Sequence, residues 1–316
     1  MKLRSRIQVT VIAVVFLRGL CLNADAVYGD LKQSDVPECP ARACGPVAAV
    51  NSFVYLQTKY PEIYTVGLAA LVGLADDQPP PLHWEQLAAS ILAGPEFMGT
   101  CCGGGTPIEK FILGKQAYIE DVIPGRTSYK AEMDIPWRPD VAGSSGHPVD
   151  KPSYVDDSTF PTAAFLRKEI ADGEDVELLL FLGNDSHYVT LTSIGPPEDG
   201  VGDMNWVDPI TGKTLQDGAV YQIVKDGFSS HLEVTYENPT THKSVTGNIS
   251  AAVSESPVPE PSSIFLLTTC LAIIAFVLCR RSTSSRTQDF DSGLPALPQN
   301  IKAGKLHLWR NSRPGR

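Results

Sequence analysis

Positive charge is scarce in this chain. Its 316 residues include 26 lysines and arginines against 36 aspartates and glutamates, which gives a formal net charge of −10. The two ends are rich in basic residues, so the stretch between them is more acidic still. A nucleic-acid-binding protein needs a basic face to neutralise phosphates, so this composition argues against a nucleic-acid partner.

Histidine is also sparse, and no internal repeat is visible. The chain has six histidines and seven cysteines, and no Cys–His spacing among them matches a zinc site. We therefore predict neither a structural metal nor a cofactor. The length suits a single domain with a hydrophobic core, once the two terminal segments described below are set aside.

The most informative residue is Cys44, which precedes the run Gly-Pro-Val-Ala-Ala-Val-Asn-Ser-Phe-Val. Apolar residues follow at helical spacing, and Pro46 suits the first turn of a helix, so we expect a helix from Gly45 to about Lys59. The unpaired N–H groups and the dipole at a helix N-terminus stabilise a thiolate, which is the form that attacks carbonyl groups. The alternative is a small buried cysteine without a chemical role.

Two residues farther along suit a base and the group that orients it. His187 begins a β-rich run, and Asp208 ends a short strand at the turn Val-Asp-Pro-Ile-Thr-Gly. The chain order Cys, His, Asp is that of a papain-type nucleophile, its base and the orienting residue. A lone histidine on a strand is usually packed or solvated, but three such residues in this order favour a catalytic triad.

Three motifs, Ala-Cys-Gly-Pro-x-Ala-Ala-x-Asn, Ser-His-Tyr-Val and Val-Asp-Pro, resemble the papain-fold family of bacteriocin-processing (double-glycine leader) peptidases. The resemblance is to the secreted, single-domain branch and spans roughly residues 35–236. It implies an α+β papain-like fold, with the nucleophile helix among N-terminal helices and an antiparallel sheet after them. It also implies that Cys44 is the nucleophile, His187 the general base and Asp208 the orienting residue of a cysteine peptidase. The chain has no G-x-x-x-x-G-K-[ST] loop, so it does not resemble the exporter-fused members.

One position departs from that resemblance. Papain-like enzymes carry a glutamine about six residues before the cysteine, and its amide helps to form the oxyanion hole, but Glu38 stands there in this chain. A carboxylate cannot donate a hydrogen bond, and loss of one oxyanion donor costs about 100- to 1000-fold in rate. Gln33 could supply the donor if residues 39–42 form an extra loop, or another group could. Otherwise the protein is a weak enzyme or an inactive surface or matrix protein; an acyl transferase on the same triad is a further alternative.

Both ends of the chain carry address signals. Basic residues precede an apolar run over residues 7–17, and Ala24-Asp25-Ala26 forms a small-residue cleavage site, which is typical of a secretory signal peptide. Export permits disulfides. If Cys44 stays free, Cys39 could pair with Cys101 or Cys102, or the last two could pair with each other.

Near the C-terminus, Pro259-Glu260-Pro261 precedes an apolar stretch over residues 264–278 and the basic pair Arg280-Arg281. The stretch is slightly shorter than the ~17 to 25 residues of a bilayer-spanning helix, and the arginines mark its cytoplasmic side. The three-part pattern resembles a PEP-CTERM sorting signal. That implies an exosortase-type sorting enzyme as partner, transient membrane anchoring, and a final place in the cell envelope or outside the cell. The alternative is an ordinary C-terminal anchor.

These segments predict the domain organisation. We expect a signal peptide over residues 1–26, a peptidase-like domain over 27–237, a polar linker over 238–257, a sorting signal with a transmembrane helix over 258–281, and a polar, basic tail over 282–316. Peptides or proteins would be the substrates. Within the domain, apolar periodicity predicts further helices at 84–93, 108–118 and 160–171, and strands at 176–182, 187–194, 204–207, 219–224 and 232–236.

Overall fold

The computed structural model describes residues 27–64, 68, 84–100, 104–143, 147–215, 219–227 and 229–258. The chain divides into two compact units, residues 1–259 and 260–316, and every described residue belongs to the first. The expected signal peptide, the sorting motif with its apolar stretch, and the tail lie outside the described residues. Among the helices that are described, none is long and apolar enough to span a bilayer.

The helices largely follow the sequence expectations. The helix α2, Cys44–Lys59, begins at the predicted nucleophile, and α3, Trp84–Ala93, has the predicted bounds. The sequence Thr-Pro-Ile-Glu at the start of α4 (Ile108–Val122) is typical of a capping box, but Glu109 instead binds Arg138. Helix α6 (Ala163–Asp172) starts three residues later than expected because Thr162 caps it, accepting a hydrogen bond from Phe165 N–H. The remaining helical elements are η1 (Gln33–Asp35) and α5 (Pro139–Ala142).

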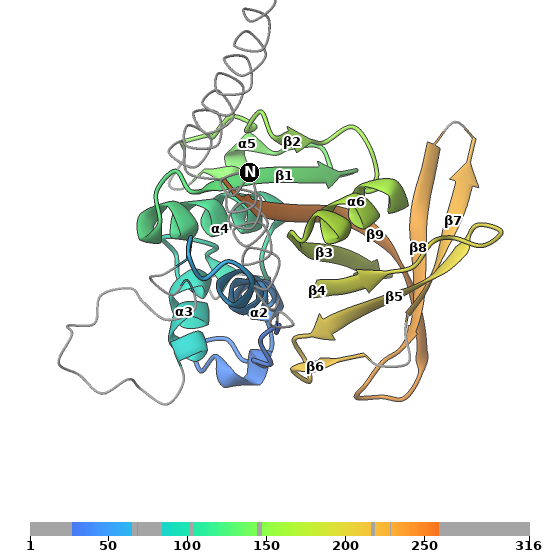
Figure 1. Ribbon diagram of the computed structural model, residues 1–316, viewed down its shortest axis with the longest axis horizontal. Helices are drawn as coiled ribbons and strands as arrows, with labels where there is room; N and C mark the ends of the chain where they lie inside the picture. Colours follow the sequence, from blue (N-terminus) through green and yellow to red (C-terminus); the bar gives the residue numbers. More distant parts are fainter. Residues whose placement is uncertain are drawn as a thin grey trace, which may run out of the picture. The chain divides into compact units, whose positions relative to one another are not determined.

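The strands form one continuous sheet that closes on itself (Figure 1). Its order is β2-β1-β9-β3-β4-β5-β7-β8, and β8 also pairs with β9, so the six strands β9, β3, β4, β5, β7 and β8 form a closed antiparallel barrel. Strands β1 and β2 extend the sheet beyond β9, and β6 pairs with β5. The bounds are β1 Thr127–Met133, β2 Val155–Asp156, β3 Asp175–Leu182, β4 Asp185–Ile194, β5 Val201–Asp208, β6 Lys213–Thr214, β7 Ala219–Asp226, β8 Ser229–Glu237 and β9 Ser244–Pro257.

The papain-like α+β fold expected from the resemblance is therefore wrong, because the strands close into a barrel instead of forming the sheet of that fold. Strand β9 was not predicted from the sequence. Its residues were expected to belong to a polar linker over 238–257, yet they pair with β1, β3 and β8. Strand β9 joins the two ends of the β3-to-β8 ladder, and this pairing closes the barrel.

Two apolar cores lie on either side of strands β3 and β4. One gathers barrel residues such as Leu178, Val189 and Trp206 together with Leu166 of α6. The other packs α2, α3 and α4 against the opposite faces of the same strands, where Tyr188 lies. Strand β3 is accordingly buried over its first six residues, as expected for a strand covered on both faces.

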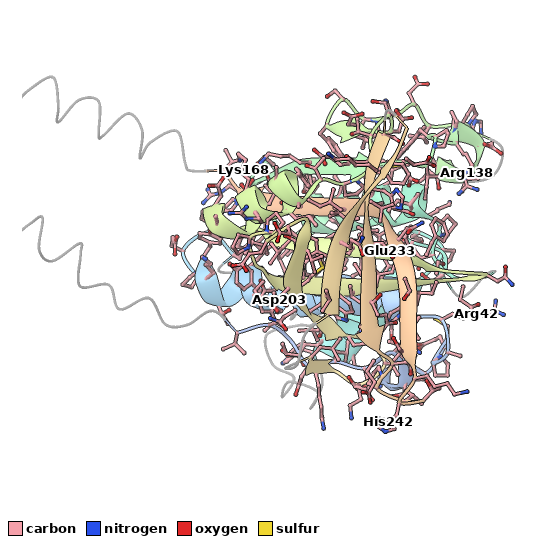
Figure 2. The ribbon with its side chains drawn as sticks, turned by 90° about the vertical axis from the view of Figure 1, so that its right-hand side faces the viewer. Arg42, Arg138, Lys168, Asp203, Glu233 and His242 are labelled. Atoms are coloured by element: carbon pink, nitrogen blue, oxygen red, sulfur yellow. The ribbon has the colours of Figure 1, made fainter. Side chains whose placement is uncertain are left out.

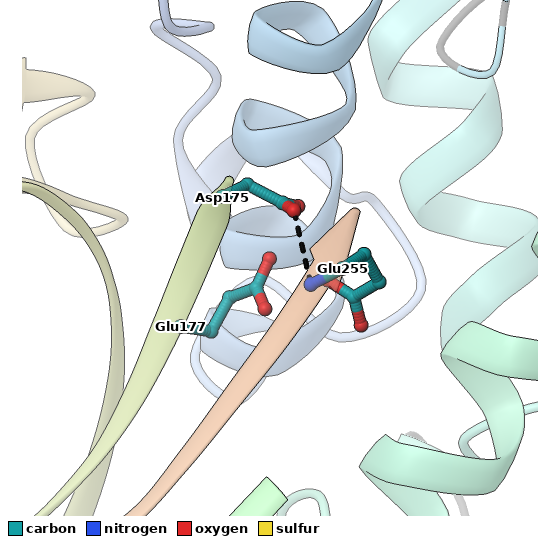
Figure 3. A group of neighbouring side chains, drawn as sticks. All are labelled: Asp175, Glu177 and Glu255. Carbon is teal, nitrogen blue, oxygen red and sulfur yellow. Dashed lines mark hydrogen bonds between the residues drawn. The ribbon is translucent and has the colours of Figure 1, made fainter. Parts of the chain in front are cut away.

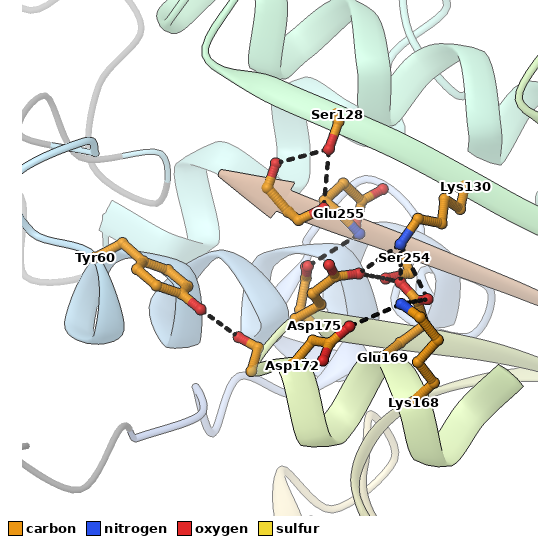
Figure 4. Close-up of polar contacts among 12 residues, drawn as sticks. Tyr60, Ser128, Lys130, Lys168, Glu169, Asp172, Asp175, Ser254 and Glu255 are labelled. Atoms are coloured by element: carbon orange, nitrogen blue, oxygen red, sulfur yellow. Dashed lines mark hydrogen bonds and ion pairs between the residues drawn. The ribbon is translucent and has the colours of Figure 1, made fainter. Parts of the chain in front are cut away.

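Charged side chains connect these layers at one edge (Figure 4). Lys130 of β1 donates to Glu169 of α6 at 2.7 Å, and Ser254 of β9 donates to the same carboxylate at 3.0 Å. Glu174 accepts from both Lys130 and Ser254. The polar residues of β9 are thus partners for buried charge, which explains why a strand so poor in large apolar residues is held in the sheet.

Candidate functional site

Cys44 is the first residue of α2; it is half-buried, and its thiol is free. Its sulfur accepts hydrogen bonds from the backbone N–H groups of Gly45 and Tyr188 and makes a side-chain hydrogen bond with His187. A Cβ atom at Gly45 would lie 2.8 Å from Thr106 Oγ1, so glycine at this position leaves room for the loop before α4 to approach the nucleophile.

His187 and Asp208 come from neighbouring barrel strands. Strands β4 and β5 are antiparallel, and Thr190 of β4 pairs with Val207 of β5. His187 precedes Thr190 and Asp208 follows Val207, so both residues lie at the same end of the two strands. His187 Nε2 lies 3.1 Å from Asp208 Oδ1, and both side chains are buried.

The turn after β5 fixes the carboxylate. Ile210 N–H donates to Asp208 Oδ1 at 2.8 Å, and the backbone N–H groups of Thr211 and Gly212 donate to the Asp208 carbonyl. Pro209, which lies between Asp208 and Ile210, supplies the bend that ends β5. The carboxylate is therefore held in place before it accepts from His187, which is how an orienting residue acts.

Cys44 and His187 shift each other's pKa. Burial favours the neutral thiol, but the hydrogen bond and charge of His187 outweigh it and lower the pKa of Cys44. Burial likewise opposes an imidazolium, yet the hydrogen bonds to Asp208 and Cys44 raise the pKa of His187 to about 10. The arrangement favours a thiolate–imidazolium pair at neutral pH.

Replacing Asp208 with asparagine will raise the pH at which Cys44 becomes reactive. The neutral amide can still accept a hydrogen bond but removes the charge that stabilises the imidazolium, so the pKa of His187 falls and that of Cys44 rises. The measurement is the iodoacetamide alkylation rate against pH for both proteins. The pH at which the alkylation rate reaches half of its plateau should move up in Asp208→Asn; superimposable profiles would show that Asp208 does not act on the pair.

The two residues considered for the oxyanion hole lie in different places. The carboxylate of Glu38 is exposed and accepts a hydrogen bond from Ser90 of α3 at 3.0 Å. Half-buried Gln33 adjoins the triad, because its backbone N–H donates to the Pro209 carbonyl at 2.7 Å. The backbone of Gln33 thus contacts the turn that carries Asp208, whereas Glu38 binds α3.

Tyr188 is a residue of this site that the sequence analysis missed. Besides its N–H contact with the sulfur, its hydroxyl donates to the Thr106 carbonyl at 3.1 Å, and its ring stacks on Phe111 at 4.5 Å between centroids. These contacts join β4 to the start of α4 across the nucleophile. Its position directly after His187 is the only sequence signal that pointed here.

Cys39 is disulfide-bonded, as one of the predicted pairings requires. Its partner lies outside the described residues, as do Cys101 and Cys102. The bond anchors the segment between η1 and α2, five residues before the nucleophile.

A second group of charges lies between α4 and the sheet (Figure 3). Asp175, Glu177 and Glu255 are buried, and their oxygens lie within 4.8 Å of one another, close enough to hold a cation. The chain supplies that cation itself: Lys115 Nζ lies 3.2 Å from Asp175, 2.5 Å from Glu177 and also contacts Glu255. We call these four residues the Lys115 cluster.

Comparisons with protein-family models, with curated proteins and with solved structures found no match to this chain.

Proposed function

We propose that this protein is an exported cysteine peptidase that hydrolyses peptide bonds in peptides or proteins through Cys44, His187 and Asp208. The observation that carries the proposal is the position of the His187 ring, which is hydrogen-bonded both to the Cys44 sulfur and to Asp208 Oδ1. A buried histidine that only served packing would not require a cysteine at a helix N-terminus on one side and a fixed carboxylate on the other.

In the proposed reaction the Cys44 thiolate attacks the carbonyl carbon of a peptide bond and forms a tetrahedral oxyanion. The imidazolium of His187 gives its proton to the leaving amine as the C–N bond breaks, which leaves a thioester on Cys44. His187 then takes a proton from water, whose oxygen attacks the thioester. The acid product leaves, and the proton returns the site to its thiolate–imidazolium state.

The oxyanion would be stabilised by the Cys44 backbone N–H at the positive end of α2 and by a second donor. The contact of Gln33 with Pro209 supports Gln33 as that donor, since it adjoins the triad. The hydrogen bond between Glu38 and Ser90 gives the Glu38 carboxylate a role away from the oxyanion. With Gln33 as the donor, a glutamate at position 38 does not prevent stabilisation of the oxyanion.

Export is part of the proposal. The signal-peptide pattern over residues 1–26 and the Pro-Glu-Pro signal with Arg280 and Arg281 indicate a protein delivered to the cell envelope by an exosortase-type enzyme. The disulfide at Cys39 supports a location outside the cytoplasm, because disulfides persist in oxidising compartments.

The function predicts that the purified protein will cleave peptides in a mixed peptide library, and that Cys44→Ala will not. Mass spectrometry of the products identifies the cleaved bonds, and an acyl-thioester on Cys44 should be trapped by acid quenching. Addition of a primary amine separates the reaction types: free carboxylate products support hydrolysis, whereas predominant amide products would identify an acyl transferase. Equal products from both proteins would contradict the proposal.

A further inference from the structure

An open cavity of about 1040 Å³ lies beside the turn that carries Asp208. Its walls come from the segment before η1, the turn and strand after β5, and the β8–β9 connection. Ile210, Leu215 and Tyr236 contribute apolar surface, Lys32, Lys213 and His242 contribute basic groups, and Glu237 contributes one carboxylate. In Figure 2, His242 lies at the bottom of the view, beyond the ends of the barrel strands.

Covalent and hydrogen-bonded links connect this cavity to the triad. Ile210, in its wall, donates its N–H to Asp208 Oδ1 at 2.8 Å. Gln33, which follows Lys32 in the chain, donates its backbone N–H to the Pro209 carbonyl. Tyr236 packs edge-on against Trp206, two residues before Asp208, at 5.1 Å between ring centroids. A ligand in the cavity would therefore lie next to the structure that holds the catalytic carboxylate.

Two lysines of the cavity wall lack a carboxylate partner among the described residues. Lys32 and Lys213 are exposed, and no carboxylate in the described part of the chain lies within ion-pair distance of either ammonium. His242 already has a partner, since its Nδ1 lies 2.9 Å from Glu237 Oε1. The barrel exterior in Figure 2 instead carries acidic residues such as Asp203 and Glu233.

The turn glycine fixes one of these lysines. Gly212 has a φ of +64°, and a Cβ atom there would lie 3.0 Å from the Lys32 side chain and closer still to the Asp30 carbonyl. Only glycine permits this close approach in that backbone conformation. The aliphatic part of the Lys32 side chain thus packs against Gly212 of the β5–β6 turn, and Lys32 forms part of the cavity wall.

We propose that this cavity binds the carboxylate side chains of an acidic peptide segment beside the turn that carries Asp208. The proposal rests on the proposed peptidase function and names its substrate class: peptides whose acidic residues occupy the cavity while another part of the peptide lies at Cys44. The lysines attract the carboxylates, and the apolar wall accommodates the stems of glutamate or neighbouring apolar residues.

The test measures binding separately from cleavage. Full-length protein carrying Cys44→Ala is titrated with rhodamine-labelled peptides that contain either a run of glutamates or the matching run of glutamines, and fluorescence anisotropy gives each Kd. We expect the glutamate peptide to bind more tightly, and the preference to shrink as salt is added. The double substitution Lys32→Glu with Lys213→Glu should weaken its binding by about tenfold or more.

Lys225→Glu is the matched control, because Lys225 is an exposed lysine of β7 outside the cavity wall. A milder pair, Lys32→Gln with Lys213→Gln, should give a smaller loss in the same direction. Equal affinity for the two peptides, or equal effects of the control and the double substitution, would overturn the cavity proposal. Alkylation of Cys44 distinguishes the two claims: slow, free-thiol alkylation of the wild type would overturn the peptidase and leave the binding result standing.

Discussion

Replacing His187 with alanine will lower kcat/KM for peptide hydrolysis by about 100- to 10,000-fold. The substitution removes the side chain that is hydrogen-bonded to the Cys44 sulfur, so the thiol returns to its protonated form. It also removes the acid that protonates the leaving amine. The measurement is steady-state cleavage of a peptide identified in the library experiment.

His147→Ala controls for the loss of a histidine, because His147 is exposed and lies outside the triad. Circular dichroism should report the same fold for both variants. Activity within a factor of about two of wild type in His187→Ala would contradict the assigned role, since a general base contributes at least about 100-fold.

Replacing Lys115 with methionine will destabilise the domain by about 3 to 5 kcal/mol, because it leaves buried carboxyl groups without a counter-charge. Lys115 is fully buried, and its ammonium contacts Asp175 and Glu177 of β3 and Glu255 of β9. These contacts fasten α4 to two adjacent strands. Urea unfolding followed by circular dichroism gives the free energy of unfolding for each protein.

The matched variant is Glu177→Gln, which keeps the shape of the side chain and removes one charge. Burial and the charge of Asp175 outweigh the attraction of Lys115 and raise the pKa of Glu177 to about 7. The native state therefore holds a proton that the unfolded chain releases nearer pH 4.5, so this group makes the protein less stable as pH rises from about 4.5 to about 7.

Glu177→Gln should flatten that part of the pH–stability curve and should partly rescue Lys115→Met. The difference between wild type and Glu177→Gln isolates the group from other carboxyls, such as Glu169, whose pKa is shifted downwards. Parallel curves for the two proteins would contradict the raised pKa. A Lys115→Met protein as stable as wild type would show that the cluster contributes nothing to the fold.

Local sequence signals predicted the elements that carry the chemistry. Pro46 and the helical spacing after Cys44 predicted α2, and apolar runs predicted strands at 176–182 and 187–194, which form the β3–β4 hairpin around Gly183 and Asn184. Gly183 has a φ of +76°, which a two-residue turn requires there. Cys44 begins α2, His187 lies near the start of β4 and Asp208 ends β5. The antiparallel pairing of β4 with β5 brings His187 and Asp208 together.

The global fold could not be predicted in the same way. Strand β9 has few large apolar residues, so its pattern is typical of a linker; its partners are buried charges and strands far away in the chain. The Lys115 cluster is equally non-local, since its members come from α4, β3 and β9. Pairing of this kind depends on residues that become neighbours only after the barrel closes.

The central claim is that Cys44 and His187 form an ion pair, and a pH titration of the thiolate tests it most directly. The ultraviolet absorbance of the thiolate is followed in wild type and in His187→Ala, with Cys44→Ser as the blank. We predict a wild-type midpoint well below the ordinary cysteine pKa of about 8.5, and an upward shift in His187→Ala. An ordinary midpoint that His187→Ala leaves unchanged would contradict the account.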